Sequence, residues 1–395
     1  MQEKVLRLKA EDGSSYPEWS EVPFGDILEQ YSNKTKTNNE DVLLSSAIDG
    51  MFLNSELFDH QRASDNTGYL KIDKGTLILS AQNLHLGNAN VNLRFEHGII
   101  SPAYKTFHLK NCIVEYMAQW VKREGTKKFF YDATTQGASQ CRRNVDWDLL
   151  LEQPILMPSL EEQKAIARFL ALYDKRIEAQ TSKVEALETR RKGLLQQIFS
   201  QEIRFKADDG SDFPDWDSVI MEDAFDSVSD KNHPDKTVLT IIQGQGTIPR
   251  DESDRNISYN KASIPTYKLV KENDFIMHLR SFEGGLEVAT REGIVSPAYT
   301  ILRNKVELVP EFYRYYFRSS SFIVEKLTGI TEGIRDGRSI NMDDFWLLEI
   351  PYPSIPEQRK IGQFMDLINR QIRIEKDKLE AIKLVKKGLL QQMFV

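Results

Sequence analysis

Residue types that commonly carry out catalysis are present in this chain of 395 residues, but none stands in a known catalytic or metal-binding spacing. The sequence contains no G-x-x-x-x-G-K-[ST], no H-E-x-x-H, no C-x-x-C and no G-x-S-x-G. The six histidines do not pair at metal-ligand spacing, and Gly244-Gln245-Gly246 is interpreted only as a loop. The pattern predicts a non-catalytic chain that holds no metal or cofactor itself.

Two polar stretches that we expect to be loops, Gln136–Asn144 and Thr331–Asn341, instead carry side chains suited to hydrogen bonding with nucleic acid. Arg, Asn and Gln recognise base edges, although arginines at such places often only neutralise phosphates. The net charge of −7 is unfavourable for this role, but residues 105–143 hold eight Lys or Arg against three Asp or Glu. A solvated charged surface would explain the same residues. The candidates in the two stretches are Gln136, Gln140, Arg142, Arg143 and Asn144, and Arg335, Arg338 and Asn341.

A tandem repeat organises the whole chain. Residues 158–199 and 353–394 are identical at 18 of 42 aligned positions, and the same offset of 195 residues aligns Ser101–Tyr104 with Ser296–Tyr299. Repeats of this length indicate two equivalent structural halves. The start of the chain, LRLKAEDG, also resembles the IRFKADDG that follows the first repeated block, so we expect the two termini to lie close together.

Each repeated block predicts a long helix. Ser159 with Glu162, and Ser354 with Glu357, match the S-x-x-E capping box. Apolar residues then recur alternately four and three apart for about four and a half heptads, which is the seam of a coiled coil. Antiparallel pairing would place Arg191 opposite Glu375, whereas parallel pairing would place it opposite a lysine. We therefore predict an intramolecular antiparallel coiled coil rather than two separate surface helices.

Further apolar residues lie off this seam near the helix ends. Antiparallel pairing would gather them into two equivalent clusters, which could pack on the chain's own domains or bind a partner. Gly193 and Gly388 lie inside the helices, where glycine costs about 1 kcal/mol relative to alanine, so we expect another element to approach the backbone there. The candidate partner-binding residues are Phe169, Leu172, Leu195 and Phe199 in the first helix and Phe364, Leu367, Leu390 and Phe394 in the second.

The segments between the helices mix strand and helix signals. Short apolar runs at 75–80, 106–109, 275–279 and 299–302 predict strands, and amphipathic patterns at about 111–124 and 310–324 predict helices. The predicted fold is α+β, with two α+β domains, a long antiparallel two-helix coiled coil and a pseudo-two-fold internal repeat. The predicted segments are a first domain at 1–157, a helix at 158–199, a second domain at 200–352 and a helix at 353–395.

Composition indicates the cellular setting. Two cysteines, Cys112 and Cys141, both lie in the first half, so a structural disulfide is not expected. No apolar run reaches the roughly 18–20 residues that span a bilayer, and no signal-peptide stretch is seen at the first residues. We expect a cytoplasmic protein.

The alternation of two diverging domains with two similar helices, each starting with P-S-x-x-E-Q and ending with K-G-L-L-Q-Q, resembles the specificity subunits of Type I restriction–modification enzymes. The resemblance covers essentially the whole chain. It implies two target-recognition domains that each read one half of a split double-stranded DNA sequence, with helices that set the spacing. It also implies two methyltransferase subunits that use S-adenosylmethionine, and restriction subunits that use ATP and Mg²⁺.

Two other functions remain possible at the level of sequence. A coiled-coil scaffold whose two domains bind proteins would fit the acidic second domain. A self-sufficient nuclease or methylase would need catalytic motifs, and the Asp/Asn-Pro-Pro-aromatic run of amino-methyltransferases is absent. Binding of duplex DNA that weakens steeply with salt would separate recognition from scaffolding.

Overall fold

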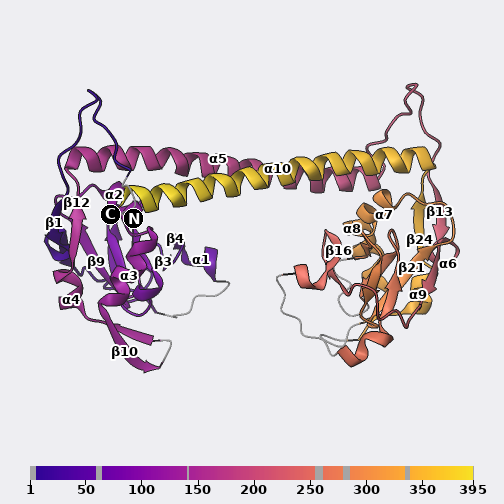
Figure 1. Ribbon diagram of the computed structural model, residues 1–395, viewed down its shortest axis with the longest axis horizontal. Coiled ribbons are helices and arrows are strands. Elements are labelled where there is room, and N and C mark those ends of the chain that lie inside the picture. Colours follow the sequence, from indigo (N-terminus) through magenta and orange to yellow (C-terminus); the bar gives the residue numbers. More distant parts are fainter. Residues whose placement is uncertain are drawn as a thin grey trace. The chain divides into compact units, whose positions relative to one another are not determined.

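The computed structural model describes residues 6–58, 65–139, 142–253, 261–278, 285–333 and 339–394. The chain divides into two compact units, unit 1 (Met1–Thr181 with Asp377–Val395) and unit 2 (Ser182–Lys376). Each unit thus contains one α+β part and portions of both long helices, α5 (Leu160–Phe199) and α10 (Ile355–Met393) (Figure 1). The predicted domain limits stay a prediction, because the two units divide within these helices.

Unit 1 is built on a four-stranded antiparallel sheet in the order β2-β9-β6-β7. Its core includes Trp120, Tyr116 and Phe107, all at most 1% exposed. The sheet strands are β2 (Leu28–Tyr31), β6 (Leu77–Ser80), β7 (Ala89–Val91) and β9 (Tyr104–Leu109). The other elements are β1 (Ser20–Pro23), β3 (Leu44–Ala47), β4 (Gly50–Leu53), α1 (Asn54–Leu57), β5 (Leu70–Asp73), β8 (His97–Ile100), α2 (Val114–Trp120), α3 (Glu124–Asp132), β10 (Thr134–Ser139), β11 (Arg142–Val145), α4 (Trp147–Glu152) and β12 (Pro154–Met157).

Unit 2 repeats this plan with the strand order β14-β21-β18-β19. In both units a two-stranded pair, β1 with β12 and β13 with β24, leads into the long helix. The sheet strands are β14 (Phe225–Val228), β18 (Phe275–His278), β19 (Glu287–Val288) and β21 (Tyr299–Asn304). The other elements are β13 (Asp217–Ile220), α6 (Met221–Ala224), β15 (Leu239–Ile242), β16 (Gly246–Pro249), β17 (Lys268–Val270), β20 (Gly293–Val295), α7 (Pro310–Tyr316), α8 (Ser320–Phe322), β22 (Thr331–Glu332), β23 (Ser339–Ile340), α9 (Met342–Trp346) and β24 (Glu349–Tyr352).

The predicted strands are confirmed as β6, β9, β18 and β21, and the two predicted domain helices are shorter than expected. Helix α2 ends at Trp120 and a second helix, α3, begins at Glu124, because Thr126 Oγ1 donates to the Trp120 carbonyl at 2.7 Å and fixes the turn. Helix α7 likewise ends at Tyr316, and Ser319 caps the short helix that follows. In unit 2 the sequence pattern hid the break because apolar residues, Phe317 and Phe322 among them, occur on both sides of it.

The heptad seam is confirmed in both long helices. Ile166 and Leu170 of α5, and Ile361 and Met365 of α10, are at most 2% exposed. The helices run antiparallel within each unit: Asp174 pairs with Lys386 in unit 1, and Lys183 pairs with Glu375 at 3.1 Å in unit 2. In unit 2, Lys183 of α5 pairs with Glu375 of α10, and Arg191 further along α5 contacts Asn369, which comes earlier in α10. Partner numbers that fall on one helix as they rise on the other show the antiparallel direction.

The register of this pairing differs from the prediction. Arg191 donates to Asn369 Oδ1 at 3.2 Å, whereas Glu375, its predicted partner, lies six residues further along α10 and pairs with Lys183. The prediction considered only the polar residues inside the seam. In the structure, the seam charges of Lys386 and Glu375 pair with Asp174 and Lys183 of α5. The two helices therefore pair in a register that is shifted by about two helical turns from the predicted one.

The helix starts also differ from the predicted capping boxes. Ser159 Oγ accepts from the Glu162 amide at 3.3 Å, but the Glu162 carboxylate is fully buried and accepts from Arg7 and from Trp19 Nε1. In unit 2 the Glu357 carboxylate accepts from Arg204, and Ser354 Oγ has no hydrogen-bond partner among the described residues. Each helix start is therefore anchored by an arginine from the segment that precedes its domain.

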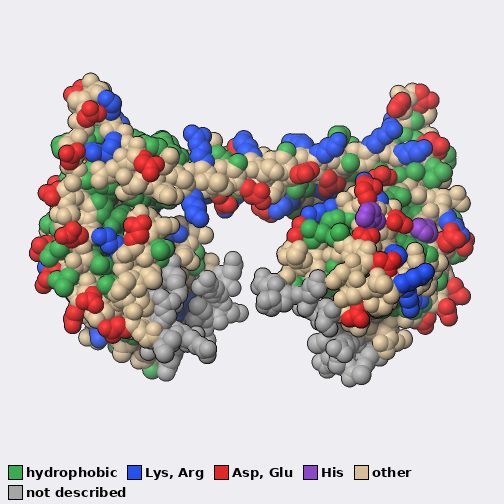
Figure 2. All heavy atoms as spheres, turned by 180° about the vertical axis from the view of Figure 1, so that it is seen from behind, with side chains coloured by type: hydrophobic (Ala, Val, Ile, Leu, Met, Phe, Trp, Pro, Cys, Tyr) green, Lys and Arg blue, Asp and Glu red, His purple; other side chains and the backbone are tan. Residues whose placement is uncertain are grey.

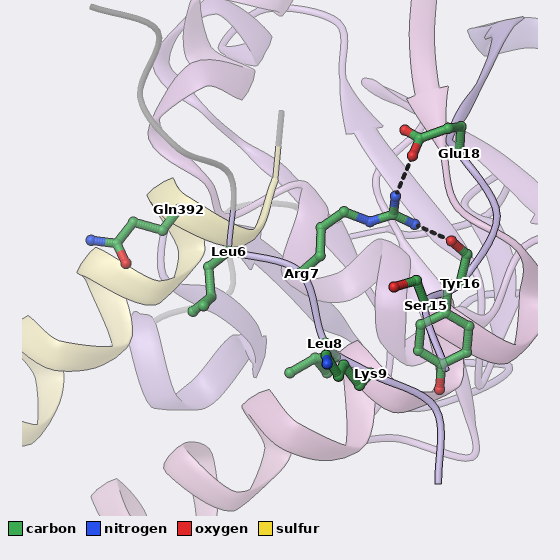
Figure 3. A pocket seen from close by; sticks show the side chains of 8 residues that line it. All are labelled: Leu6, Arg7, Leu8, Lys9, Ser15, Tyr16, Glu18 and Gln392. Carbon is green, nitrogen blue, oxygen red and sulfur yellow. Dashed lines mark hydrogen bonds and ion pairs between the residues drawn. The ribbon is translucent and has the colours of Figure 1, made fainter. Parts of the chain in front are cut away.

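The first described residues of the chain lie beside the end of α10, as expected for neighbouring termini. The Leu6 amide donates to the Gln392 carbonyl at 2.8 Å. An open pocket of about 570 Å³ lies between these two segments and is lined by Arg7, Tyr16 and Glu18 among others (Figure 3). Within the pocket, Arg7 Nη1 pairs with Glu18 at 3.2 Å.

Candidate nucleic-acid interface

The two polar stretches form matching β-hairpins, not the loops that the sequence predicted. In unit 1, β10 and β11 pair from Thr134 with Val145 to Ser139 with Arg142, with an irregularity between Gln136 and Ser139. In unit 2, β22 and β23 pair Thr331 with Ile340 and Glu332 with Ser339. Backbone pairing organises both stretches although their side chains show no regular alternation.

The hairpin of unit 1 carries most of the candidates in its half. Gln136 lies on β10, and β11 carries Arg142, Arg143 and the exposed Asn144. Gln140 lies outside the described residues. The hairpin thus brings the strand-borne candidates together, and their contact with DNA stays a prediction.

Arg143 is held by its own hairpin. Its Nε donates to Thr134 Oγ1 at 2.6 Å and its Nη2 donates to the Thr134 carbonyl at 2.8 Å. The guanidinium also lies 4.0 Å from the ring centroid of Tyr131, which is 48% exposed. The guanidinium is thus held in place with one face against the Tyr131 ring, and two of its nitrogens already donate to Thr134. Such a fixed positive charge suits contact with a phosphate better than bidentate recognition of a base.

The candidates of unit 2 are arranged differently. Asn341 caps helix α9, because its Oδ1 accepts from the amides of Asp343 and Asp344, and its Nδ2 donates to Glu332 at 2.7 Å. The side-chain amide is therefore engaged in local structure. Arg335 and Arg338 lie outside the described residues.

The Lys and Arg side chains of the described residues do not form one continuous patch on the face shown in Figure 2. On the face shown in Figure 2, basic and acidic side chains are interspersed over both units. Lys122, one of the basic residues of 105–143, is committed to internal contacts through its ammonium group.

Comparison with known proteins decides the family. The model of the Type I restriction modification DNA specificity domain matches residues 16–189 and 287–384, which is more than half of the chain. The chain belongs to this family. Its two matched regions cover parts of both units, in agreement with the internal repeat. It is a specificity subunit of a Type I restriction–modification system, whose function is DNA sequence recognition.

Two curated relatives come from Methanocaldococcus jannaschii. The Type I restriction enzyme MjaVIII specificity subunit is 23% identical over 419 aligned positions, with 98% of this chain and 95% of the relative covered. The putative Type I restriction enzyme MjaX specificity subunit is 22% identical over 349 positions, with 85% of this chain and 76% of the relative covered. Both are similar along most of their length.

Two solved structures share the fold. The S subunit of a Type I restriction–modification system from M. genitalium has a TM-score of 0.54 and 13% identity, with 99% of each chain covered. A chain from a structure concerned with complex assembly and conformational transition of a Type I system has a TM-score of 0.58 and 16% identity, with 96% and 98% covered. The predicted fold class is thereby confirmed.

The described residues of this specificity subunit contain no group of His, Cys, Asp or Glu that could hold a metal ion. Burial raises the pKa of the Cys112 thiol to about 12, which disfavours the reactive thiolate. None of the helices in the described ranges is long and apolar enough to cross a membrane.

The candidate partner-binding residues fall into two groups. Six of them lie in or against the cores of the two units: Phe169, Leu390 and Phe394 in unit 1, and Leu195, Phe199 and Phe364 in unit 2. The other two, Leu172 and Leu367, occupy equivalent repeat positions and are 58% and 60% exposed. Packing within the chain therefore accounts for the apolar character of the first six residues. The partner-binding prediction rests on the two exposed residues, Leu172 and Leu367.

Gly193 and Gly388 are not approached by any other described part of the chain. A Cβ atom at either position would meet nothing within 4 Å among the described residues. The described residues therefore do not make the close approach that the sequence predicted. The two glycines are left on helix surfaces despite their cost to helix stability.

Proposed function

We propose that unit 1 and unit 2 each read one half of a bipartite DNA sequence. The observation that carries this proposal is the repeated plan: the same strand order and the same hairpins occur in both units, while their loop sequences differ. Conserved scaffolds with differing loops are expected of modules that recognise different ligands. Membership of the DNA specificity family supplies the class of ligand.

We also propose that α5 and α10 set the spacing between the half-sites. Each is continuous over 40 and 39 residues, so each has a length of roughly 60 Å at 1.5 Å per residue. One turn of DNA measures about 34 Å. A helix of this length suits half-sites separated by more than one turn.

The chain itself would carry no catalytic step in this proposal. Methyl transfer from S-adenosylmethionine would belong to two methyltransferase subunits, and ATP- and Mg²⁺-dependent steps to restriction subunits. The pseudo-two-fold repeat supports two copies of the methyltransferase, because it offers each copy an equivalent surface. Leu172 and Leu367 are the described apolar side chains that match across the repeat and remain exposed.

The test is to express the chain with its methyltransferase subunit and sequence the host DNA with detection of methylated adenine. A bipartite motif with a fixed gap is expected, and it should be absent when the methyltransferase is expressed without this chain. DNA binding by the complex should also weaken steeply with salt. A single continuous motif, or methylation that does not depend on this chain, would contradict the proposal.

The two surface glycines give a prediction about partner docking. Gly193→Ala with Gly388→Ala is expected to stabilise the isolated chain by about 1 kcal/mol per site, because alanine favours the helix. The same double variant should reduce co-purification with the methyltransferase if a partner helix packs against these backbones. Ser182→Ala, at another exposed position of α5, is the control that should stabilise the helix without affecting assembly. Unchanged co-purification of the glycine variant would show that docking occurs elsewhere.

A further inference from the structure

A second hairpin in each unit is docked on the domain in the same way. These hairpins are β3–β4 in unit 1 and β15–β16 in unit 2. Leu44 packs so closely on Gly98 that a Cβ atom there would lie 2.5 Å from its Cδ1, and Leu239 packs on Gly293 with a corresponding 2.6 Å. The two contacts are related by the repeat offset of 195 residues, which separates Leu44 from Leu239 and Gly98 from Gly293. The base of this hairpin therefore belongs to the scaffold that the two units share.

In unit 1, side chains from other elements hold the turn of this hairpin. Ala47 pairs with Gly50, which leaves Ile48 and Asp49 at the tip. Lys122 Nζ donates to the Ile48 carbonyl at 2.7 Å, and Asn90 Nδ2 donates to the Ala47 carbonyl at 2.8 Å. Successive turn carbonyls are thus fixed from outside the hairpin.

In unit 2, different side chains hold the turn of the corresponding hairpin. Ile242 pairs with Gly246, so the turn is Gln243-Gly244-Gln245. The Gly244 amide donates to Glu287 Oε1 at 2.7 Å, and the Arg318 guanidinium forms an ion pair with Glu287 at 3.1 Å. Glu287 is only 6% exposed, and this burial raises its pKa although Arg318 acts in the opposite direction.

The holding residues occupy equivalent places. Asn90 lies opposite Ile78 on edge strand β7, and Glu287 lies opposite Ile276 on edge strand β19. Lys122 and Arg318 each stand two residues after the end of the first domain helix, α2 or α7. Both units therefore use a buried polar residue and a cation at the same two positions to fix one turn.

The turn itself is what differs between the units. Unit 1 has a two-residue tip of Ile48 and Asp49, and unit 2 has a three-residue tip with two glutamines. All three residues Gln243, Gly244 and Gln245 are exposed, and Gly244 and Gly246 have φ values of +84° and +81°. A rigid base with a variable exposed tip is the arrangement expected of an element that determines specificity.

We propose that the turn Gln243–Gln245 reads adenine edges in the half-site bound by unit 2, with Glu287 and Arg318 as positioning residues. The glutamine amide can donate to and accept from the adenine N7 and N6 groups at once. A turn fixed before binding loses less conformational freedom when it engages a base. The tip Ile48–Asp49 takes the corresponding place in unit 1. This inference rests on the proposed function and adds to it the element that touches the bases.

The experiment uses the complex with the methyltransferase and compares methylated motifs by sequencing. Gln243→Ala with Gln245→Ala should relax discrimination at one or two adenine-containing positions by roughly tenfold to a hundredfold, in one half-site only. The other half-site should stay unchanged. Gln371→Ala, which removes an exposed glutamine from α10, is the matched control and should leave the motif intact.

The positioning residues are tested in the same assay. Glu287→Gln and Arg318→Lys should relax the same positions as the glutamine variant, and neither should add to its effect when combined with it. An unchanged motif in the double glutamine variant would overturn the inference, as would an equal loss of both half-sites. A wild-type complex that yields no bipartite motif would instead refute the proposed function, before any variant is compared.

Discussion

Replacing Arg7 by alanine is expected to lower the free energy of unfolding of unit 1 by about 3–5 kcal/mol. Arg7 donates to both carboxylate oxygens of Glu162, at 3.2 and 2.9 Å, and Glu162 is fully buried at the start of α5. The variant leaves that carboxylate with Trp19 Nε1 at 3.0 Å but without a compensating charge. An uncompensated buried charge costs far more than a lost surface ion pair.

Hydrogen exchange of the full chain measures this effect unit by unit. Peptides of unit 1 should exchange faster in Arg7→Ala, while those of unit 2 serve as an internal reference. Adding Glu162→Gln should recover much of the loss, because it removes the buried charge. Arg204→Ala should act in the same way on unit 2 through Glu357. Equal protection in Arg7→Ala and wild type would show that the buried pair contributes little.

The sequence predicted the long helices well because burial follows a fixed period there. Ile166, Leu170, Ile361 and Met365 follow this period, and all are buried. The antiparallel direction was also correct, although Arg191 and Glu375, the pair from which it was inferred, are not partners. The register was wrong, because Asp174 and Lys183 lie outside the seam and were not considered.

The candidate site was less predictable for two physical reasons. Hairpins such as β10–β11 are fixed by backbone pairing between polar residues, which leaves no apolar alternation to detect. The contacts of Lys122 with the β3–β4 turn join residues more than 70 positions apart. Apolar periodicity, in turn, cannot tell a helix face that packs on its own domain from one that binds a partner, and Phe169 and Leu172 illustrate the two outcomes.

Gly362→Ala should show that equivalent positions of the two long helices differ in the space available for a side chain. The repeat aligns Gly362 of α10 with Ala167 of α5, so sequence alone would favour alanine at both positions and a gain of about 1 kcal/mol in helix stability. In unit 2, however, a Cβ atom at Gly362 would lie 2.7 Å from Glu311 Cβ and 3.2 Å from the Phe312 amide nitrogen. We therefore expect Gly362→Ala to lower the free energy of unfolding of unit 2 by about 1–3 kcal/mol.

The paired substitutions separate packing from helix propensity. Ala167→Gly should lower the free energy of unfolding of unit 1 by about 1 kcal/mol. Glycine has a lower helix propensity than alanine, and the lost methyl group leaves a small space at a position that is 5% exposed. Gly193→Ala, on an open helix surface, should be stabilising. If Gly362→Ala were stabilising as well, α7 would have to move away from α10 at little cost. Because Glu311 Cβ and the α7 backbone, and not a flexible side-chain end, occupy the space, hydrogen exchange should instead show faster opening of α7 together with the first turns of α10.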